Sequence, residues 1–436
     1  MAKADGAKGL RGGVPRRRRA LKPALVTPDD MSPRLATGHE ASCLAWNAGM
    51  LLLILLVGGL VLWHQYRDGQ PGTTEPFQER DAASEQNRQE KGRYQLLERL
   101  VSDDGSACDA VLDTAQQVLF LRVGDTVIGG RFVDPSVEDQ PVFTGFAVQR
   151  MLPWVQLVGE SRSAGDSSGG NSTVAKGILV LGLGDGSTAQ FFAHTLKLPI
   201  AAVELERCVI TLAQRHFKFQ FQEGTQTGTA VGEPVIEVHH KDARLFIDQY
   251  DGSARGKYQF VLHDLYSVGG NNVELMDPVE LMRLKENVLH RDGVLLLNHV
   301  GFIDSGERAI LSESIVDSLT RVFKHVHCYR DLPLDVEPEE ASNIACFAAD
   351  RPFEFAIPTE FRLLDEAEYS CFWVWRHVHE WEVLQHITLR ADESYDVDDE
   401  PLLRRHASAV RDAARFAAES IYTREDMRPF WEFVMG

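Results

Sequence analysis

The sequence of 436 residues has few cysteines and a deficit of basic residues. Its six cysteines lie far apart and none forms a CxxC pair, so their spacing predicts neither a disulfide framework nor a zinc site. Lys and Arg number 45 against 64 Asp and Glu, which gives a formal net charge of -19. Loose binding to a phosphate backbone needs clustered cations. The composition therefore argues against a nucleic-acid partner, whereas the 44% hydrophobic content predicts a folded core.

Charge is also missing from one long apolar run. Residues 41–63 carry no charged side chain and include the stretch LLLILLVGGLVLW. A helix of this length measures about 35 Å, enough to cross a hydrocarbon core of about 30 Å. Trp46 and Trp63 stand near its two ends, where indole rings favour the membrane interface. We therefore expect a single transmembrane helix, preceded by a basic tail over 1–40 and followed by a polar stalk over 64–92.

The basic residues around this run predict its orientation. Arg16 to Arg19 form a cluster in the N-terminal tail, and basic flanks stay on the cytoplasmic side. The C-terminal domain is then lumenal, in the endomembrane system, with the sequon at Asn171 on the same side. A cleaved signal peptide is the rival, but 40 residues precede the apolar run and no A-x-A site closes it. The opposite orientation, with a cytosolic domain, stays open.

The rest of the chain shows the pattern of an α/β domain. Residues 93–160 predict a small β element, with a hairpin turn at Gly124 and Asp125, and a linking helix over 145–158. Over 174–350, five apolar runs alternate with segments long enough for helices. This order predicts a doubly wound, mostly parallel sheet of seven strands, with an antiparallel hairpin (325–331 and 343–349) at one edge.

The last part, residues 351–436, is expected to be a helical extension. The Trp-rich stretch 371–388 has apolar residues at helical spacing and should pack one face on the sheet domain. The Ala-rich stretch 402–421 predicts a second helix. Adjacent or alternate histidines at 239/240, 325/327 and 377/379 are expected to be solvated or core-edge residues, and we expect no metal.

The residues that end the predicted strands are glycines and acids. Ligands of such sheets bind beyond the carboxyl ends of the strands. Strand one ends in a glycine loop, strand two in an acid 18 residues further on, and two more strands end in acids; these residues are Gly182, Gly184, Asp185, Gly186, Glu204, Asp242 and Asp264. A carboxylate after a glycine loop can accept from both ribose hydroxyls. The pattern predicts a nucleoside cofactor, and GxGxG in place of GxGxxG disfavours a dinucleotide.

Four motifs in this order resemble one family. GLGDGS, VELERCVITLAQRHF, KDA and VLHDLYS are similar to the spermidine synthase branch of the class I S-adenosylmethionine-dependent methyltransferase superfamily, over roughly residues 105–350. The resemblance implies a Rossmann-like fold and S-adenosylmethionine, or its decarboxylated form, as cofactor. It further implies these roles: Gly182, Gly184 and Gly186 around the methionine part, Asp185 near its amino group, Glu204 on the ribose, Asp242 and Ala243 beside the adenine, and Gln116 on the cofactor.

The departures from that family bear on the reaction. Asp264 matches the first of two acids that polyamine synthases carry after the fourth strand, but Ser267 replaces the second. Their aromatic-Gln-Glu step is not found in GFAVQRML. Methyltransferase-like proteins with a spermidine-synthase-type domain share such losses. The Ile-Leu-Asn motif that ends one of their strands resembles Leu296-Leu297-Asn298 of this chain. By that resemblance Asp264 is the catalytic residue, positioning or deprotonating an amine or other nucleophile of a small-molecule or protein acceptor.

Three functions follow as alternatives. The first is a membrane-anchored methyltransferase, the second an aminopropyltransferase that uses the decarboxylated cofactor, and the third a catalytically inert binding module. A homodimer is compatible with each of them.

Overall fold

The structure is a computed structural model. It describes residues 92–137, 140–158, 176–223, 236–252, 256–267, 270–303, 308–331, 340–357, 374–375, 377–383 and 408–417. The chain divides into two units, Met1–Gln78 and Glu79–Gly436, and all described residues belong to the second. The expected basic tail, transmembrane helix and nearly all of the stalk lie outside the described residues. Within the described ranges no helix is both long and apolar enough to span a membrane.

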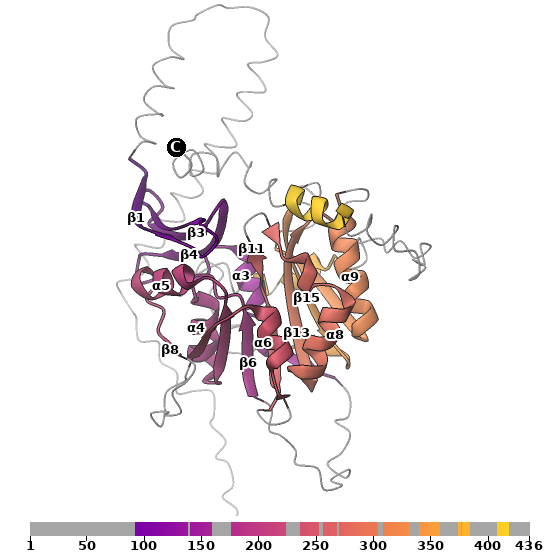
Figure 1. Ribbon diagram of the computed structural model, residues 1–436. Coiled ribbons are helices and arrows are strands. Elements are labelled where there is room, and N and C mark those ends of the chain that lie inside the picture. The colour runs from indigo at the N-terminus through magenta and orange to yellow at the C-terminus, as the bar shows by residue number, and fades with distance from the viewer. Residues whose placement is uncertain are drawn as a thin grey trace, which may run out of the picture. The chain divides into compact units, whose positions relative to one another are not determined.

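A four-stranded antiparallel sheet leads the domain (Figure 1). Its strands follow one another in chain order: β1 (Tyr94–Val101), β2 (Ala107–Asp113), β3 (Val118–Val123) and β4 (Thr126–Phe132). All six residues of β3, VLFLRV, are buried, because one face of this strand packs against helix α5 (Arg207–His216) and the other against a cluster around Phe143. The hairpin expected at Gly124 and Asp125 is confirmed as the turn between β3 and β4.

The main sheet has the order β14-β15-β13-β10-β6-β7-β9-β8. Its strands are β6 (Lys176–Leu181), β7 (Ile200–Glu204), β8 (Gln222–Glu223), β9 (Ile236–His240), β10 (Tyr258–His263), β13 (Leu289–Gly301), β14 (His325–Arg330) and β15 (Ser342–Ala349). The five central pairings are parallel, and only β15 runs antiparallel to its neighbours. The mixed α/β sheet, its five apolar strands and the edge hairpin are confirmed, and the two-residue β8 extends the expected seven strands by one.

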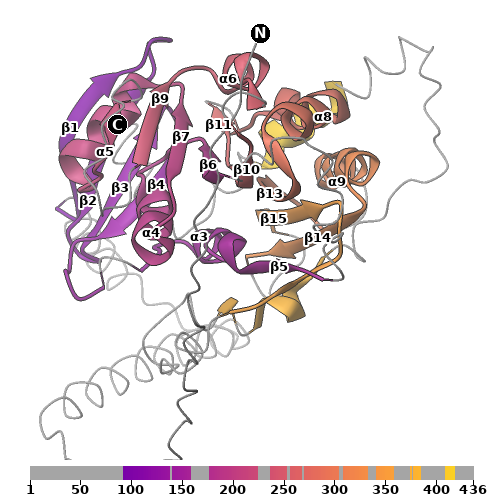
Figure 2. The ribbon, with the colours of Figure 1, turned by 90° about the horizontal axis from the view of Figure 1, so that it is seen from below.

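Helices cover both faces of this sheet, as Figure 2 shows. One face carries α6 (Ala243–Gln249), α8 (Pro278–Asn287) and α9 (Ile310–Val322); the other carries α3 (Thr144–Gln149) and α4 (Ser187–Leu196). Helix α5 (Arg207–His216) packs between the main sheet and β1 to β3. The parallel strands consist largely of apolar residues because both faces of the sheet are covered by helices.

Short elements complete the described chain. Two 3-10 helices, η1 (Leu152–Trp154) and η2 (Val273–Leu275), flank the core, and β11 (Tyr266–Ser267) pairs with β12 (Gly270–Asn271). The helix expected over 145–158 is wrong beyond Gln149. Helix α3 ends at Gln149, and after η1 the chain forms β5 (Val155–Leu157), paired with β16 (Phe353–Phe355). Pro153 lacks the N–H that a continuing α-helix needs.

The C-terminal extension differs from its expectation in one respect. In the described part of the Trp-rich stretch, Val378–Trp381 form the 3-10 helix η4 and Glu382 bridges to Tyr329, so a continuous helix through 388 is wrong. Packing of this stretch on the sheet is confirmed, because Trp375 and Trp381 are buried in the core beneath α3 and α4. Residues 408–417 are helical, within the expected second helix, and pack on the opposite core.

Two disulfides correct the expectation drawn from cysteine spacing. Cys108 of β2 is bonded to Cys208 of α5, and Cys328 of β14 to its cross-strand neighbour Cys346 of β15. The partners are 100 and 18 residues apart, so no local motif marks them. Only the packing of α5 on β2 and the register of β14 against β15 bring them together.

Candidate functional site

The glycine loop after β6 is closely packed against other parts of the chain. Gly182, Gly184 and Gly186 have φ of 88°, 56° and 79°, a region that disfavours side chains. A Cβ at Gly182 would lie 2.1 Å from the carbonyl oxygen of Asp264, and one at Gly184 would lie 2.6 Å from that of Ile128. At Gly186 it would meet the Phe219 ring at 2.4 Å. These glycines are thus required by the fold, which brings the end of β10 and strand β4 against the loop.

Asp185 is buried within that loop, with an exposed fraction of 3%. One carboxylate oxygen, Oδ1, accepts from the backbone N–H of Ser187 at 2.9 Å. The other, Oδ2, is buried and has no hydrogen-bond partner among the described residues. Burial raises the pKa of Asp185, while the hydrogen bonds from Ser187, the charge of Arg150 and the nearby backbone N–H of Gly130 oppose that rise. A buried acceptor without a donor is costly, so a ligand that donates here stabilises the loop.

Glu204 ends β7 and is held by the backbone on both of its oxygens. Oε2 accepts from the N–H of Leu183 and Oε1 from that of Glu206, each at 2.9 Å. Burial raises the pKa of Glu204, and these backbone donors lower it. Each oxygen keeps a second lone pair. The side chain is therefore fixed in place with acceptor capacity left for two hydroxyl groups.

Three further predicted residues have other contacts. Asp242 is the N-cap of α6 and accepts from the N–H of Leu245 at 2.9 Å, and Ala243 is buried behind it. Gln116 is exposed in the turn between β2 and β3, where its N–H donates to Asp113. Its role, like those of Asp242 and Ala243, stays a prediction.

Asp264 follows β10, and its carboxylate accepts hydrogen bonds from two side-chain amides. Gln149, the last residue of α3, donates from Nε2 to Oδ2 at 3.0 Å, and Asn298 of β13 donates from Nδ2 to Oδ1 at 2.9 Å. Burial raises the pKa of Asp264; the two amide donors lower it, and the charge of Asp185 raises it further. The carboxylate is thus oriented by elements on both sides of β10.

Asn298 has a further contact beyond Asp264, and the side-chain amides of Gln149 and Asn298 each keep a carbonyl oxygen that accepts no hydrogen bond among the described residues. Asn298 also lies 3.4 Å from Oδ1 of Asn343, whose own amide donates to Asp331 at 3.0 Å. The carbonyl oxygens of Gln149 and Asn298 are buried and have no partner in the described ranges. Both side chains are almost fully buried, so an acceptor-rich patch surrounds Asp264.

Buried histidines near this region are not cations at neutral pH. Burial lowers the pKa of His263, just before Asp264, to about 4 and that of His299, next to Asn298, to about 3. No group of three or more His, Cys, Asp or Glu side chains among the described residues is arranged to hold a metal ion.

The acids named from the strand ends gather at one edge of the sheet, as the parallel arrangement requires. Direct contacts join Asp264 to the glycine loop through Gly182 and Glu204 to it through Leu183. Sequence patterns missed Gln149 as a partner of Asp264, and Asn298 carried no assigned role. Gln149 could have been noticed because it is a glutamine within the apolar stretch GFAVQRML, and a buried amide needs hydrogen-bond partners.

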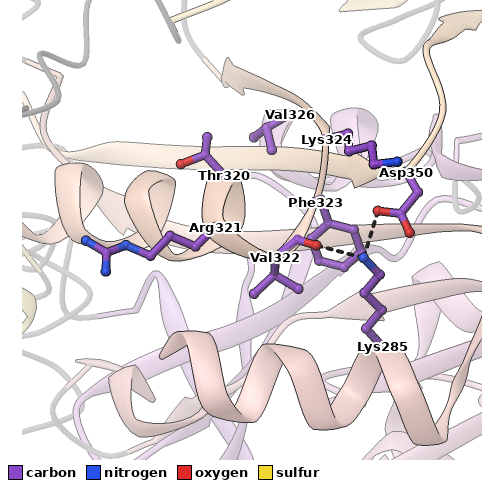
Figure 3. A pocket seen from close by; sticks show the side chains of 8 residues that line it. All are labelled: Lys285, Thr320, Arg321, Val322, Phe323, Lys324, Val326 and Asp350. Atoms are coloured by element: carbon purple, nitrogen blue, oxygen red, sulfur yellow. Dashed lines mark hydrogen bonds and ion pairs between the residues drawn. The ribbon is translucent and has the colours of Figure 1, made fainter. Parts of the chain in front are cut away.

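A pocket of about 540 Å³ lies elsewhere, between the ends of α8, α9 and β15 (Figure 3). Lys285 lines it and is fully engaged: its Nζ donates to the Val322 carbonyl and to Asp350, each at 2.7 Å, and lies 4.9 Å from the Phe323 ring centre. This pocket is at the opposite edge of the sheet from Asp264.

Comparisons with known proteins found similarity to solved structures only. No protein-family model and no curated protein sequence matches the chain. A probable spermidine synthase from Corynebacterium glutamicum is similar in structure, with 15% identity and a TM-score of 0.44 over 61% of this chain and 84% of that one. For a spermidine synthase from Thermotoga maritima the values are 14%, 0.40, 62% and 79%.

Human methyltransferase-like protein 13, solved in complex with SAH, is also similar, with 21% identity and a TM-score of 0.33 over 52% of this chain and 89% of that one. Solved structures that resemble this chain therefore include both spermidine synthases and a methyltransferase-like protein, the two groups that its sequence motifs resemble.

Proposed function

We propose that this chain is an S-adenosylmethionine-dependent methyltransferase. One observation carries the proposal: the buried Oδ2 of Asp185, without a donor in the described chain, lies in a glycine loop directly joined to Glu204 and Asp264. An acceptor aimed at this place suits the amino group of a methionine moiety. Glu204, with both oxygens already oriented, suits the two hydroxyls of a ribose.

The residues around Asp264 suit a transfer to a nucleophile that carries a proton. S-adenosylmethionine, when bound, supplies a methyl group activated by a sulfonium. Asp264 is oriented by Gln149 and Asn298 to hold an amine or similar nucleophile in line with that carbon. Asp264 would take up the proton that the nucleophile loses when it is methylated. A pKa raised by burial makes Asp264 a better proton acceptor.

Binding of the cofactor to the full-length chain tests the proposal. Isothermal titration of the detergent-solubilised protein with S-adenosylhomocysteine should show one site. Glu204→Ala should weaken binding at least about 100-fold, because it removes the acceptor that fixes Leu183 and Glu206 as well as the ribose contact. Asp350→Ala removes a carboxylate at the opposite edge and should leave the affinity unchanged.

The outcomes separate the three functions. Absence of binding to the unmodified chain contradicts the proposal. Transfer of an aminopropyl group from decarboxylated cofactor to putrescine, spermidine or cadaverine would favour the polyamine synthase alternative. Tight binding without turnover on any acceptor would favour an inert module.

We further propose a single membrane anchor with the domain on the lumenal side. The uncharged run 41–63 and the Arg16 to Arg19 cluster support it, and two disulfides are typical of proteins that fold in oxidising compartments. In sealed microsomes the domain should resist added protease until detergent is present. Digestion without detergent would place it in the cytosol.

A further inference from the structure

The C-terminal extension makes a direct contact with the helix that ends at Gln149. Trp375 of the extension is 4% exposed, and its indole N–H donates to the backbone carbonyl of Ala147 in α3 at 2.7 Å. These two residues are 228 apart in the chain, and Ala147 is itself fully buried. The hydrogen bond therefore links the extension to α3 inside the core.

Helix α3 receives little support from its own sequence. It has six residues, whereas an isolated helix needs about 12 or more to be stable in water. Its N-cap, Phe143, makes no side-chain hydrogen bond, the first turn has no acid and the last turn has no base. The last carbonyls of a helix also lack donors within it, and the indole of Trp375 supplies one for Ala147. The position of α3 thus depends on tertiary contacts.

The indole that makes this bond is held firmly in place. The ring of Trp375 lies edge-on to that of Trp154 in η1, with centroids 4.4 Å apart, and 6.3 Å from that of Phe191 in α4. Further along the extension, the backbone N–H of Val383 donates to the carbonyl of Cys328 in β14 at 2.8 Å. The extension is therefore anchored to the main sheet and can fix the helix that it contacts.

Two residues after Ala147, α3 ends at the amide that contacts Asp264. Gln149 is fully buried and donates from Nε2 to Oδ2 of Asp264 at 3.0 Å. Two residues along a helix rise only about 3 Å, so the backbone at Ala147 and at Gln149 moves together. A displacement of the helix by about 1 Å would be enough to break a hydrogen bond of this length.

We propose that Trp375 is a positioning residue for Asp264: by holding the Ala147 carbonyl, it fixes α3 in the place from which Gln149 orients the carboxylate. The inference rests on the proposed function, in which Asp264 holds the nucleophile, and it adds the C-terminal extension to the elements that build the site. Trp375 acts through α3 and takes no part in the transfer itself.

The titration of Asp264 reports whether Gln149 still reaches it. Burial raises the pKa of Asp264, the amides of Asn298 and Gln149 lower it, and the charge of Asp185 raises it further. Gln149→Leu should therefore move this titration to higher pH by about one pH unit, which corresponds to a hydrogen bond to a charged group. Trp375→Phe keeps an apolar ring, removes the donor and should move the titration in the same direction. Chemical unfolding of the full-length, cofactor-free protein over a pH series, each variant against its Asp264→Asn counterpart, measures the shift.

A double variant separates positioning from a general loss of stability. If Trp375 acts through Gln149, adding Trp375→Phe to Gln149→Leu should produce no further shift. Val383→Ala is the matched control, because it truncates another fully buried side chain of the extension, one that packs in the core on the opposite face of the sheet. It should lower stability without moving the titration of Asp264.

The outcomes are distinct. An unmoved titration in Trp375→Phe would overturn the inference, as would additive shifts in the double variant or an equal shift in Val383→Ala. Should Trp375→Phe fail to fold, the unmodified chain labelled at its seven tryptophans provides a second measurement. An indole N–H resonance should follow the titration of Asp264 and cease to do so in Gln149→Leu; if none follows it, the inference fails. These readouts need no ligand, so absence of S-adenosylhomocysteine binding would instead contradict the proposed function alone.

Discussion

The two edges of the main sheet differ in how their buried polar groups are satisfied. At the carboxyl edge, Asp185, Gln149 and Asn298 each keep a buried oxygen without a donor among the described residues. At the opposite edge, Lys285 has a carbonyl, a carboxylate and an aromatic ring as partners. The opposite edge has a pocket, but the lysine that lines it is already paired with groups of the fold itself.

This difference indicates which end of the sheet is suited to binding a ligand. An unsatisfied buried acceptor costs free energy that a bound donor recovers, whereas Lys285 of α8 stabilises the C-terminus of α9 through its bond to the Val322 carbonyl. Volume alone would point to the wrong edge. Substitutions at the carboxyl edge should therefore weaken cofactor binding, whereas substitutions at the opposite edge should change stability alone.

The largest effect is expected from the disulfide beside the carboxyl edge. Cys108→Ala opens a bridge that spans 100 residues and should lower the free energy of unfolding by about 4 kcal/mol. It also releases β2 from α5, the helix that follows Glu204, so cofactor affinity should fall too. Cys328→Ala, in a bridge spanning 18 residues, should cost about 3 kcal/mol and spare binding. Urea unfolding and titration check both; equal binding losses would contradict the distinction.

A smaller effect is expected at Gly182. Gly182→Ala combines a φ of 88° with a Cβ only 2.1 Å from the Asp264 carbonyl, so it should cost about 3 kcal/mol and displace Asp264. Gly105→Ala is the matched control, because φ is 90° there and no atom lies within 4 Å. It should cost about 1 kcal/mol and leave binding unchanged. Similar losses in urea unfolding for both variants would mean that the loop yields.

At the opposite edge we expect a modest change in stability alone. Lys285→Met removes two hydrogen bonds that join α8 to the end of α9 and to Asp350. Since the pair is partly exposed, the free energy of unfolding should fall by about 1 kcal/mol. The affinity for S-adenosylhomocysteine should be unaffected. A weakened affinity would show that this edge also takes part in binding.

The subtlest test is the pH dependence of stability. Burial raises the pKa of Asp264 from its ordinary value of 3.8. An acid whose pKa is higher in the folded than in the unfolded state stabilises the fold below the unfolded value, and this contribution is lost as the pH rises through the folded value. The cofactor-free protein should therefore lose stability relative to Asp264→Asn as the pH rises above 3.8. Chemical unfolding at a series of pH values measures the difference, and a constant difference would argue against the raised pKa.

Several features of this protein were predictable because they depend on local sequence. Apolar runs such as ILVL and GVLLL form strands buried on both faces, and their alternation with helical segments predicts the parallel order. Glu204 and Asp264 could be named because parallel strands end at the same edge. The hairpin of β14 and β15 followed from two short apolar runs separated by a loop.

Other features depend on contacts between distant residues. The contact between Gln149 and Asp264 joins residues 115 apart. The disulfide between Cys108 and Cys208 requires β2 to pack on α5. Neither spacing nor composition records which surfaces meet.

The alternation of strands and helices can be recognised in the sequence, as can the acids at the strand ends and the uncharged run at 41–63, since each is a local pattern. The folded structure is needed to show which acids are buried, which amides orient Asp264 and which cysteines pair. These properties arise from packing, which removes water from particular side chains and brings together groups that the chain keeps far apart.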